Sequence, residues 1–144
     1  MARVYISLDI ETTGLDADRD AILEIGAVRF KGSQVLDTFS ALINPERPIP
    51  YKIQQLTDIT PADIAGAPLL AEVLPRLERF VGDNPLIGHN IGFDVGFLRK
   101  HNVLMQQPAI DTFELASILL PYAGRYGLAV VPREVNCDRD NPYA

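Results

Sequence analysis

The sequence predicts an α/β domain built around a mixed β-sheet, and two observations support this fold class. Apolar stretches rich in Val and Ile, separated by turn residues, fill the first third of the chain and are typical of consecutive strands. Later segments alternate between helical and strand-like patterns, which is typical of strands joined by crossover helices. The 144 residues, 47% of them hydrophobic and 22% charged, suffice for one globular domain with its own core.

The first part of the chain predicts a three-stranded meander. Strand-like segments run from Arg3 to Ile10, from Ala21 to Phe30 and from Gln34 to Ile43. The second and third of these flank the turn Lys31-Gly32-Ser33. The proline-rich segment Asn44 to Pro50 fits neither a helix nor a central strand, so it is expected to be a connection.

The second part of the chain predicts helices that alternate with short strands. Leu69 to Val81 has the 3.6-residue apolar period of an amphipathic helix, which we expect to cover the sheet. A brief buried strand is expected at Asn84 to Gly88, followed by a helix from Gly92 to His101. A last strand is expected at Pro108 to Asp111, leading into a helix from Thr112 to Leu120.

Charge and composition exclude several classes of protein. The formal net charge of -6 comes with no basic stripe, so nucleic acid would have to be held through divalent cations or by a partner. The single cysteine, Cys137, cannot form an internal disulfide, which favours a reducing compartment. No apolar run approaches the roughly 18 residues of a membrane span, and Asp9 interrupts the N-terminal apolar segment too early for a secretory signal. These features predict a cytoplasmic protein.

Three acidic residues stand where the predicted sheet could present them together. Asp9 and Glu11 are two residues apart, so on a strand their carboxylates point to the same face. Asp94 falls in the first turn of a helix that follows a buried strand, just beyond a strand end. Oxygen ligands in this arrangement suit Mg²⁺ or Mn²⁺. The alternative is that all three are ordinary solvated surface acids, and the spacing alone leaves it open.

Longer motifs around these acids resemble those of the DEDD exonucleases, the family that includes the proofreading subunit of bacterial DNA polymerase III. Asp9-Ile10-Glu11-Thr12-Thr13-Gly14-Leu15 is similar to the first family motif, and His89-Asn90-Ile91-Gly92-Phe93-Asp94 is similar to the second. Leu56 to Thr60 and Ile110 to Thr112 also match family segments. The resemblance covers Arg3 to Leu128, and its wording is close to exonuclease domains attached to some bacterial helicases.

The resemblance implies a ribonuclease-H-like five-stranded sheet and hydrolysis of the terminal phosphodiester of DNA or RNA at a free 3' end. The family site uses two ions, Mg²⁺ or Mn²⁺. Carried over to this chain, Asp9 would bridge both ions, Glu11 would help to bind the water-activating ion, and Asp94 would support the other. The implied partners are nucleic acid and a DNA polymerase or helicase, with no membrane.

The same motifs imply contacts with the terminal nucleotide. Gly14 would let the backbone approach closely, and Leu15 would offer an apolar wedge against a base. Phe93 would contact the sugar or base, although an aromatic residue at a helix start is at least as often part of the core. The full set of expected substrate-binding residues is Thr12, Thr13, Gly14, Leu15, Asn90 and Phe93.

The chain departs from the family pattern at two places. Asp58 stands where relatives usually carry glycine, and Asp tolerates the left-handed backbone that such a turn requires.

The sequence predicts an exonuclease-like domain at residues 1–128 and a divergent tail at 129–144, with the C-terminal helix truncated. The tail has no His, so it lacks the family's usual third motif, and it has no Tyr followed by Asp four residues later, as the other subtype requires. Acids in the tail that could replace the missing ligand are Glu134, Asp138 and Asp140.

Neither remaining histidine is expected to take over the role of the missing one. His89 precedes the second motif and is expected to be a structural hydrogen-bonder. His101 lies seven residues beyond Asp94, about 10 Å along a helix axis. Without a general base, turnover is expected to fall by about 10²-fold or more. The alternatives are a non-catalytic nucleic-acid-binding or interaction module, or an incomplete product of a truncated or frameshifted gene.

Overall fold

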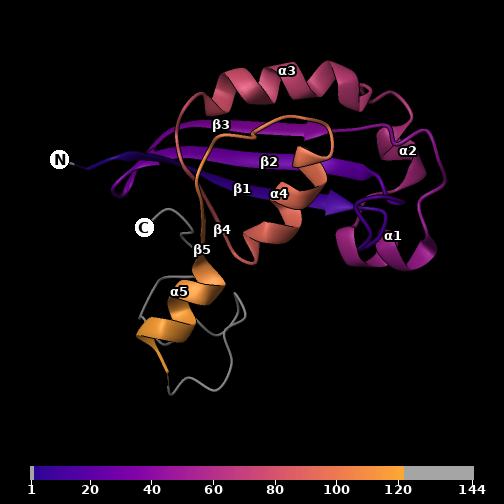
Figure 1. The fold of residues 1–144 in the computed structure, drawn as a ribbon. Coiled ribbons are helices and arrows are strands. Elements are labelled where there is room, and N and C mark those ends of the chain that lie inside the picture. Colours follow the sequence, from indigo (N-terminus) through magenta and orange to yellow (C-terminus); the bar gives the residue numbers. More distant parts are fainter. Residues whose placement is uncertain (1, 122–144) are drawn as a thin grey trace.

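The computed structural model describes residues 2–121, so the expected boundary at residue 128 and the whole tail lie outside it. The described residues form one five-stranded sheet in the order β3-β2-β1-β4-β5 (Figure 1). The first three strands pair antiparallel and the last two pair parallel, which confirms the predicted mixed sheet. The strands are β1 (Val4–Thr12), β2 (Ile22–Lys31), β3 (Gln34–Leu42), β4 (Leu86–Gly88) and β5 (Ala109–Asp111).

Helices flank this sheet and also cluster at one of its ends. The predicted helices are present as α3 (Leu70–Val81), α4 (Ile91–Arg99) and α5 (Thr112–Leu119). Two short helices were not predicted from periodicity, α1 (Tyr51–Thr57) and α2 (Pro61–Ile64). Figure 1 shows them together at one end of the sheet, while α5 projects away beyond β5. Within residues 2–121, no helix has both the length and the hydrophobicity needed to cross a bilayer.

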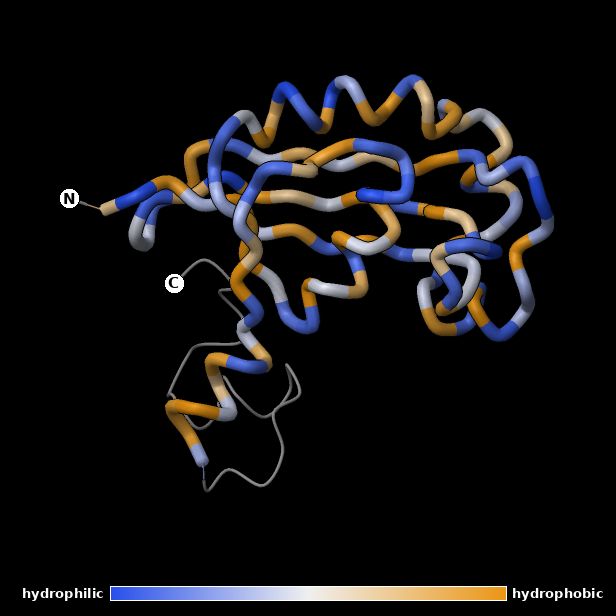
Figure 2. Tube along the Cα trace, viewed as in Figure 1, coloured by the Kyte–Doolittle hydropathy of each residue, from blue (hydrophilic) through white to orange (hydrophobic). Residues whose placement is uncertain are grey.

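The main core lies on one face of the sheet. Along β1, Ile6, Leu8 and Ile10 are buried and pack with apolar residues of α3 and α4. Figure 2 shows the apolar stripe of α3 turned toward the sheet and its polar residues turned outward. The alternate residues of β1 point to the opposite face because side chains in a strand alternate between faces. Asp9 and Glu11 belong to this second set.

The ends of α1 and α2 explain how the segment after the proline-rich connection folds. Asp58 ends α1 in the left-handed conformation, with φ 60°, and its N–H donates to the carbonyl of Gln54 at 2.9 Å. The expectation that Asp accommodates this turn is therefore confirmed. Thr60 and Asp63 form a capping box at the start of α2, with Pro61 in its first turn. This spacing is a local sequence signal that could have predicted the second helix.

Candidate active site

Two of the three expected carboxylates lie on β1, at the end that leads into the following loop. Asp9 is exposed and Glu11 is half-buried, while Ile10 between them is buried in the core. Both acids therefore project from the second face of the sheet, as their two-residue spacing predicts. A bulge between Glu11 and Thr12 interrupts the pairing with β2 at this point. Such bulges redirect the chain beside many active sites.

Asp94 reaches this region because β4 ends early. The N–H of Ile6 donates to the carbonyl of Pro85 just before β4, so by alternation the N–H of Ile10 points to the same edge of β1. β4 ends at Gly88, and the carboxylate of Asp94 accepts the Ile10 N–H at 2.9 Å. Asp94 is only 4% exposed. One hydrogen bond thus fixes the α4 acid against the strand that carries the other two.

A close backbone approach allows α4 to begin beside β1. A Cβ atom at Gly88 would lie 2.9 Å from the carbonyl oxygen of Leu8, so any larger residue would push β4 and the start of α4 away. Asn90 then caps α4 in the left-handed conformation, and its N–H donates to Asp111 at 2.9 Å. The position of Asp94 therefore depends on the ends of both β4 and β5.

His89 has a structural role in the described residues. Its Nδ1 lies 3.1 Å from the hydroxyl oxygen of Thr112, and its ring meets Phe113 edge-on with centroids 5.4 Å apart. These contacts join the second motif to the start of α5. They agree with the expectation that His89 is a hydrogen-bonding residue rather than a general base.

Burial and like charges both act on the three acids. Burial, followed by the charges of Asp9 and Glu11, raises the pKa of Asp94 to about 6, even though the Ile10 hydrogen bond opposes the shift. Although Asp9 is exposed as a residue, partial desolvation of its carboxylate by the surrounding protein raises its pKa, and a hydrogen bond from the Ile10 backbone opposes the shift. The pKa of Glu11 is raised by burial, then by Asp9 and by Glu24. The hydrogen bond from Ile10, which lies between Asp9 and Glu11, places Asp94 beside both acids. Their like charges repel one another, and a bound cation would relieve that repulsion.

Glu24 is an acid near the site that the sequence reasoning missed. It is half-buried on β2 and pairs directly with Glu11 across the antiparallel ladder. The two side chains therefore share one face of the sheet. The sequence could have indicated this pair, because aligning the first two strands of the predicted meander in their correct register places Glu11 opposite Glu24.

The donor chemistry of the cluster fits a divalent cation, although the side chains do not form a complete metal centre. Carboxylate oxygens from a strand pair and a neighbouring helix are the ligands that Mg²⁺ and Mn²⁺ prefer. Within residues 2–121, no group of three or more His, Cys, Asp or Glu side chains is arranged to hold a metal ion. One oxygen of Asp94 is engaged by Ile10. The structure thus brings the acids together without closing them into a binding group.

The residues expected to bind the nucleotide differ in how accessible they are. Thr12 and Thr13 are buried, and their hydroxyl groups donate within the loop, to the Gly14 carbonyl at 2.6 Å and to Asp20 at 3.3 Å. Leu15 is 87% exposed, so it is free to meet a ligand. Asn90 is exposed.

Phe93 lies on α4 close to Asp94, and its ring packs against the main core. It is half-buried against the main core, and its ring centroid lies 5.0 Å from that of Phe97. The core alternative for this residue therefore has structural support, although its remaining exposed surface leaves a substrate contact open.

His101 lies away from the acidic cluster. It lines a cavity of about 440 Å³ that also contains Asp20, Arg47 and apolar residues from β2 and α3. Asp9, Glu11 and Asp94 do not line this cavity. The position of His101 agrees with the expectation that it cannot act on a water molecule held by Asp94.

Comparison with known proteins assigns the family. The RNase_T exonuclease family model matches residues 6–138. The chain belongs to this exonuclease family. Its sheet and flanking helices also match those of solved exonucleases. Exonuclease X, determined in complex with 5' overhanging duplex DNA, shares 27% identity with a TM-score of 0.74, over 96% of this chain and 76% of that one.

Polymerase-associated members of the exonuclease family are close in sequence. The PolC-type DNA polymerase III of Clostridium perfringens is 40% identical over 141 residues, which cover 95% of this chain but 10% of that protein. The DNA polymerase III subunit epsilon of Aquifex aeolicus is 34% identical over 129 residues, covering 86% of this chain and 64% of the subunit. This chain therefore spans about a tenth of the PolC-type polymerase.

Proposed function

We propose that this exonuclease-family chain hydrolyses DNA from a free 3' end, with Asp9, Glu11 and Asp94 as its catalytic carboxylates. The observation that carries the proposal is the hydrogen bond from the Ile10 N–H to Asp94. It holds the α4 acid beside the strand that presents the other two. The raised pKa of Asp94 supports the same arrangement, because the neighbouring negative charges contribute to it.

Two Mg²⁺ or Mn²⁺ ions are the proposed cofactors. When bound, such ions supply an activated water and stabilise the leaving 3'-oxygen. Asp9 would hold both ions, since it is the most exposed of the three acids. Glu11 and Asp94 would each complete one of the two sites. Bound cations would also lower the pKa values of these acids by favouring their ionised forms.

The loop after β1 would hold the terminal nucleotide. Because the Thr12 and Thr13 hydroxyls are used inside the loop, their contribution would come from the backbone. Leu15 would pack against the terminal base through its exposed side chain. Asn90 and Phe93 would approach from the start of α4.

DNA is the proposed substrate and a replicative polymerase the proposed partner. Exonuclease X was solved with duplex DNA, and two of the similar sequences are DNA polymerase III proteins. A partner would also supply affinity for DNA, because a chain with a net charge of -6 binds phosphates weakly by itself. A helicase remains the other candidate partner.

A non-catalytic nucleic-acid-binding module is the second candidate function. It is favoured by the lack of a preassembled metal-binding group within residues 2–121. It is also favoured by the absence of any histidine after His101 in the sequence. In the first candidate, the same lack of a positioned base leaves the chain an impaired enzyme.

The decisive experiment follows a 5'-labelled single-stranded DNA oligonucleotide in Mn²⁺ buffer. We expect stepwise shortening from the 3' end, at a rate about 10²-fold or more below that of a relative with a complete third motif. Asp9→Ala should abolish the shortening, whereas Asp83→Ala, an exposed change after α3, should leave it unchanged. Binding without shortening would favour the non-catalytic module, and shortening that survives Asp9→Ala would refute the assigned carboxylates.

A further inference from the structure

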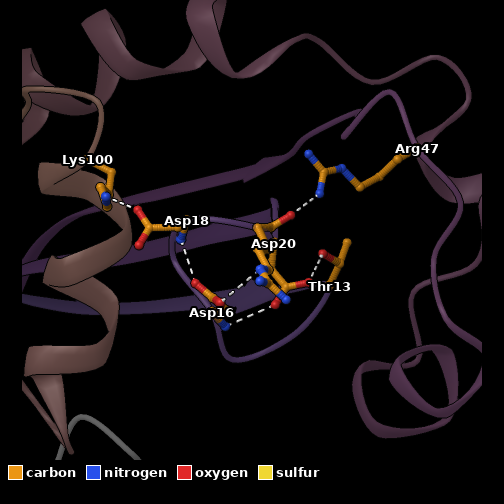
Figure 3. Close-up of polar contacts among 7 residues, drawn as sticks. Thr13, Asp16, Asp18, Asp20, Arg47 and Lys100 are labelled. Atoms are coloured by element: carbon orange, nitrogen blue, oxygen red, sulfur yellow. Dashed lines mark hydrogen bonds and ion pairs between the residues drawn. The ribbon is translucent and has the colours of Figure 1, made fainter.

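The loop that follows β1 is organised around the carboxylate of Asp20. The Thr13 hydroxyl donates to one Asp20 oxygen at 3.3 Å, and the Asp16 N–H donates to the other at 2.9 Å (Figure 3). The Thr13 hydroxyl oxygen also accepts the N–H of Ala21 at 2.9 Å. Asp20 therefore holds both sides of the turn that carries Gly14 and Leu15.

Gly14 is required here by space rather than by backbone conformation. Its φ is not positive, yet a Cβ atom would lie 2.4 Å from an Asp20 oxygen and 2.5 Å from the Asp20 carboxyl carbon. The loop wraps the carboxylate so closely that any side chain at this position would force the Asp20 carboxylate to move. Gly14 and Asp20 are thus a matched pair, and an alanine at Gly14 would have to displace the carboxylate from its hydrogen bonds.

Weaker contacts link the rim of the loop to its surroundings. Asp18 forms an ion pair with Lys100 at the end of α4, and Arg47 donates to the carbonyl of Arg19 (Figure 3). The ion pair is largely exposed, so it contributes little by itself. The half-buried Asp20 is the residue that sets the shape of the loop.

We propose that Asp20 is a positioning residue that fixes this loop so that Leu15 meets the terminal base of a DNA strand. The inference rests on the proposed function, because it assumes that the strand end lies at Asp9, Glu11 and Asp94. Asp20 acts through Thr13 and Asp16 and does not touch the substrate. It therefore governs recognition of a strand end, not metal binding.

The test compares the affinity for linear single-stranded DNA with that for circular single-stranded DNA of the same sequence. The linear probe ends in a nuclease-resistant phosphorothioate linkage, and Mn²⁺ is present. Asp20→Asn removes the negative charge and replaces one acceptor oxygen with an amide group, so only one of the two hydrogen bonds can keep its direction and neither stays charge-assisted. We expect it to reduce the preference for the linear probe about tenfold, as the loss of a charge-assisted hydrogen bond implies. Mn²⁺ affinity should stay unchanged.

Three further variants separate positioning from general damage to the fold. Asp37→Asn, an exposed change on β3, should keep the wild-type preference. Leu15→Ala, at an exposed position, should lose it with the melting temperature unchanged. Gly14→Ala and Asp20→Ala should each lose the preference for linear DNA. The double variant should show the same loss as Asp20→Ala alone, because both substitutions act on the same contact.

The outcomes distinguish the inference from the proposed function. If the wild type does not prefer linear DNA, the proposed 3'-end function fails. If the wild type prefers linear DNA and a folded Asp20→Asn keeps that preference, only the positioning role is refuted. If Asp20→Asn does not fold, the Leu15→Ala variant provides the test. An unchanged preference for linear DNA in Leu15→Ala would also refute the inference.

Discussion

Asp94 serves the fold and the candidate site at the same time. Its carboxylate satisfies the N–H of Ile10 where β4 has ended, which is a structural task. Its burial next to Asp9 and Glu11 raises its pKa to about 6, which disfavours the ionised form. A residue with these two roles is expected to reduce stability in return for function.

The pKa of Asp94 predicts a specific dependence of stability on pH. Between the unfolded value of 3.8 and the folded value of about 6, the folded state keeps a proton that the unfolded chain has released. The free energy of unfolding should therefore fall as pH rises through this range, by about 3 kcal/mol for a shift of about two pKa units. Asp94→Asn keeps an acceptor for Ile10 but cannot ionise, so it should lack this fall.

Urea unfolding in EDTA buffer at pH 4 and pH 7 measures the difference. From pH 4 to pH 7, the free energy of unfolding of Asp94→Asn should rise relative to that of the wild type. The free energy of unfolding of the surface variant Asp83→Asn should change with pH as that of the wild type does. A constant difference between Asp94→Asn and the wild type at both values would contradict the raised pKa.

Asp9 makes a second prediction at the residue scale, concerning metal binding. We expect the wild type to bind Mn²⁺ weakly, because the carboxylates are close together but not closed into a binding group. Asp9→Ala should lose most of this binding, since it removes the acid proposed to hold both ions. Calorimetric titration of both proteins and of Asp83→Ala checks this, and identical heats for wild type and Asp9→Ala would remove the metal-site proposal.

At the scale of elements, α3 forms in spite of an internal proline. Its apolar residues Val73, Leu77 and Val81 are fully buried against the sheet, and this burial drives the helix. Pro75 has no N–H for the carbonyl of Ala71, so one helical hydrogen bond is missing. Tertiary packing therefore outweighs local propensity in this helix.

Replacing Pro75 with alanine should stabilise the protein. A proline within a helix costs about 3 kcal/mol relative to alanine, and its restriction of the unfolded chain offsets roughly 1 kcal/mol of that. We expect Pro75→Ala to raise the free energy of unfolding by about 2 kcal/mol, measured by urea unfolding. Pro68→Ala, before the helix, should give no such gain. A lower midpoint for Pro75→Ala would show that α3 depends on the proline.

At the scale of the whole molecule, the two faces of the sheet are unequal. The main core lies between one face and helices α3 and α4. On α5, which projects beyond β5 (Figure 1), Ile118 is 74% exposed and Leu119 is 67% exposed. Exposed apolar side chains that lie together favour association.

We therefore expect this chain to self-associate at high concentration. Ile118→Lys combined with Leu119→Lys should shift it toward the monomer, because lysine removes the apolar contact and adds repulsion. Light scattering at increasing protein concentration measures the effect. A wild-type chain that stays monomeric at every concentration would contradict the expectation.

The sequence predicted most of the elements because their signals are local. Apolar stretches rich in Val and Ile placed β1, β2 and β3, and the helical period placed α3 within one residue of its start. Among the elements of residues 2–121, only α1 and α2 were not predicted, since they are too short to show a period. The capping box of α2 was nevertheless present in the sequence as a local signal.

The sequence by itself determined the fold class, the family resemblance and the shared face of Asp9 and Glu11, because strand alternation and motif wording depend on near neighbours in the chain. Only the tertiary structure decided that Asp94 bonds to Ile10 across 84 residues, that Glu24 faces Glu11, and that Asp20 fills the space under Gly14. These contacts depend on strand register, on where β4 stops and on how closely two backbones approach. Such distances are set by the packing of the whole sheet, which no local pattern encodes.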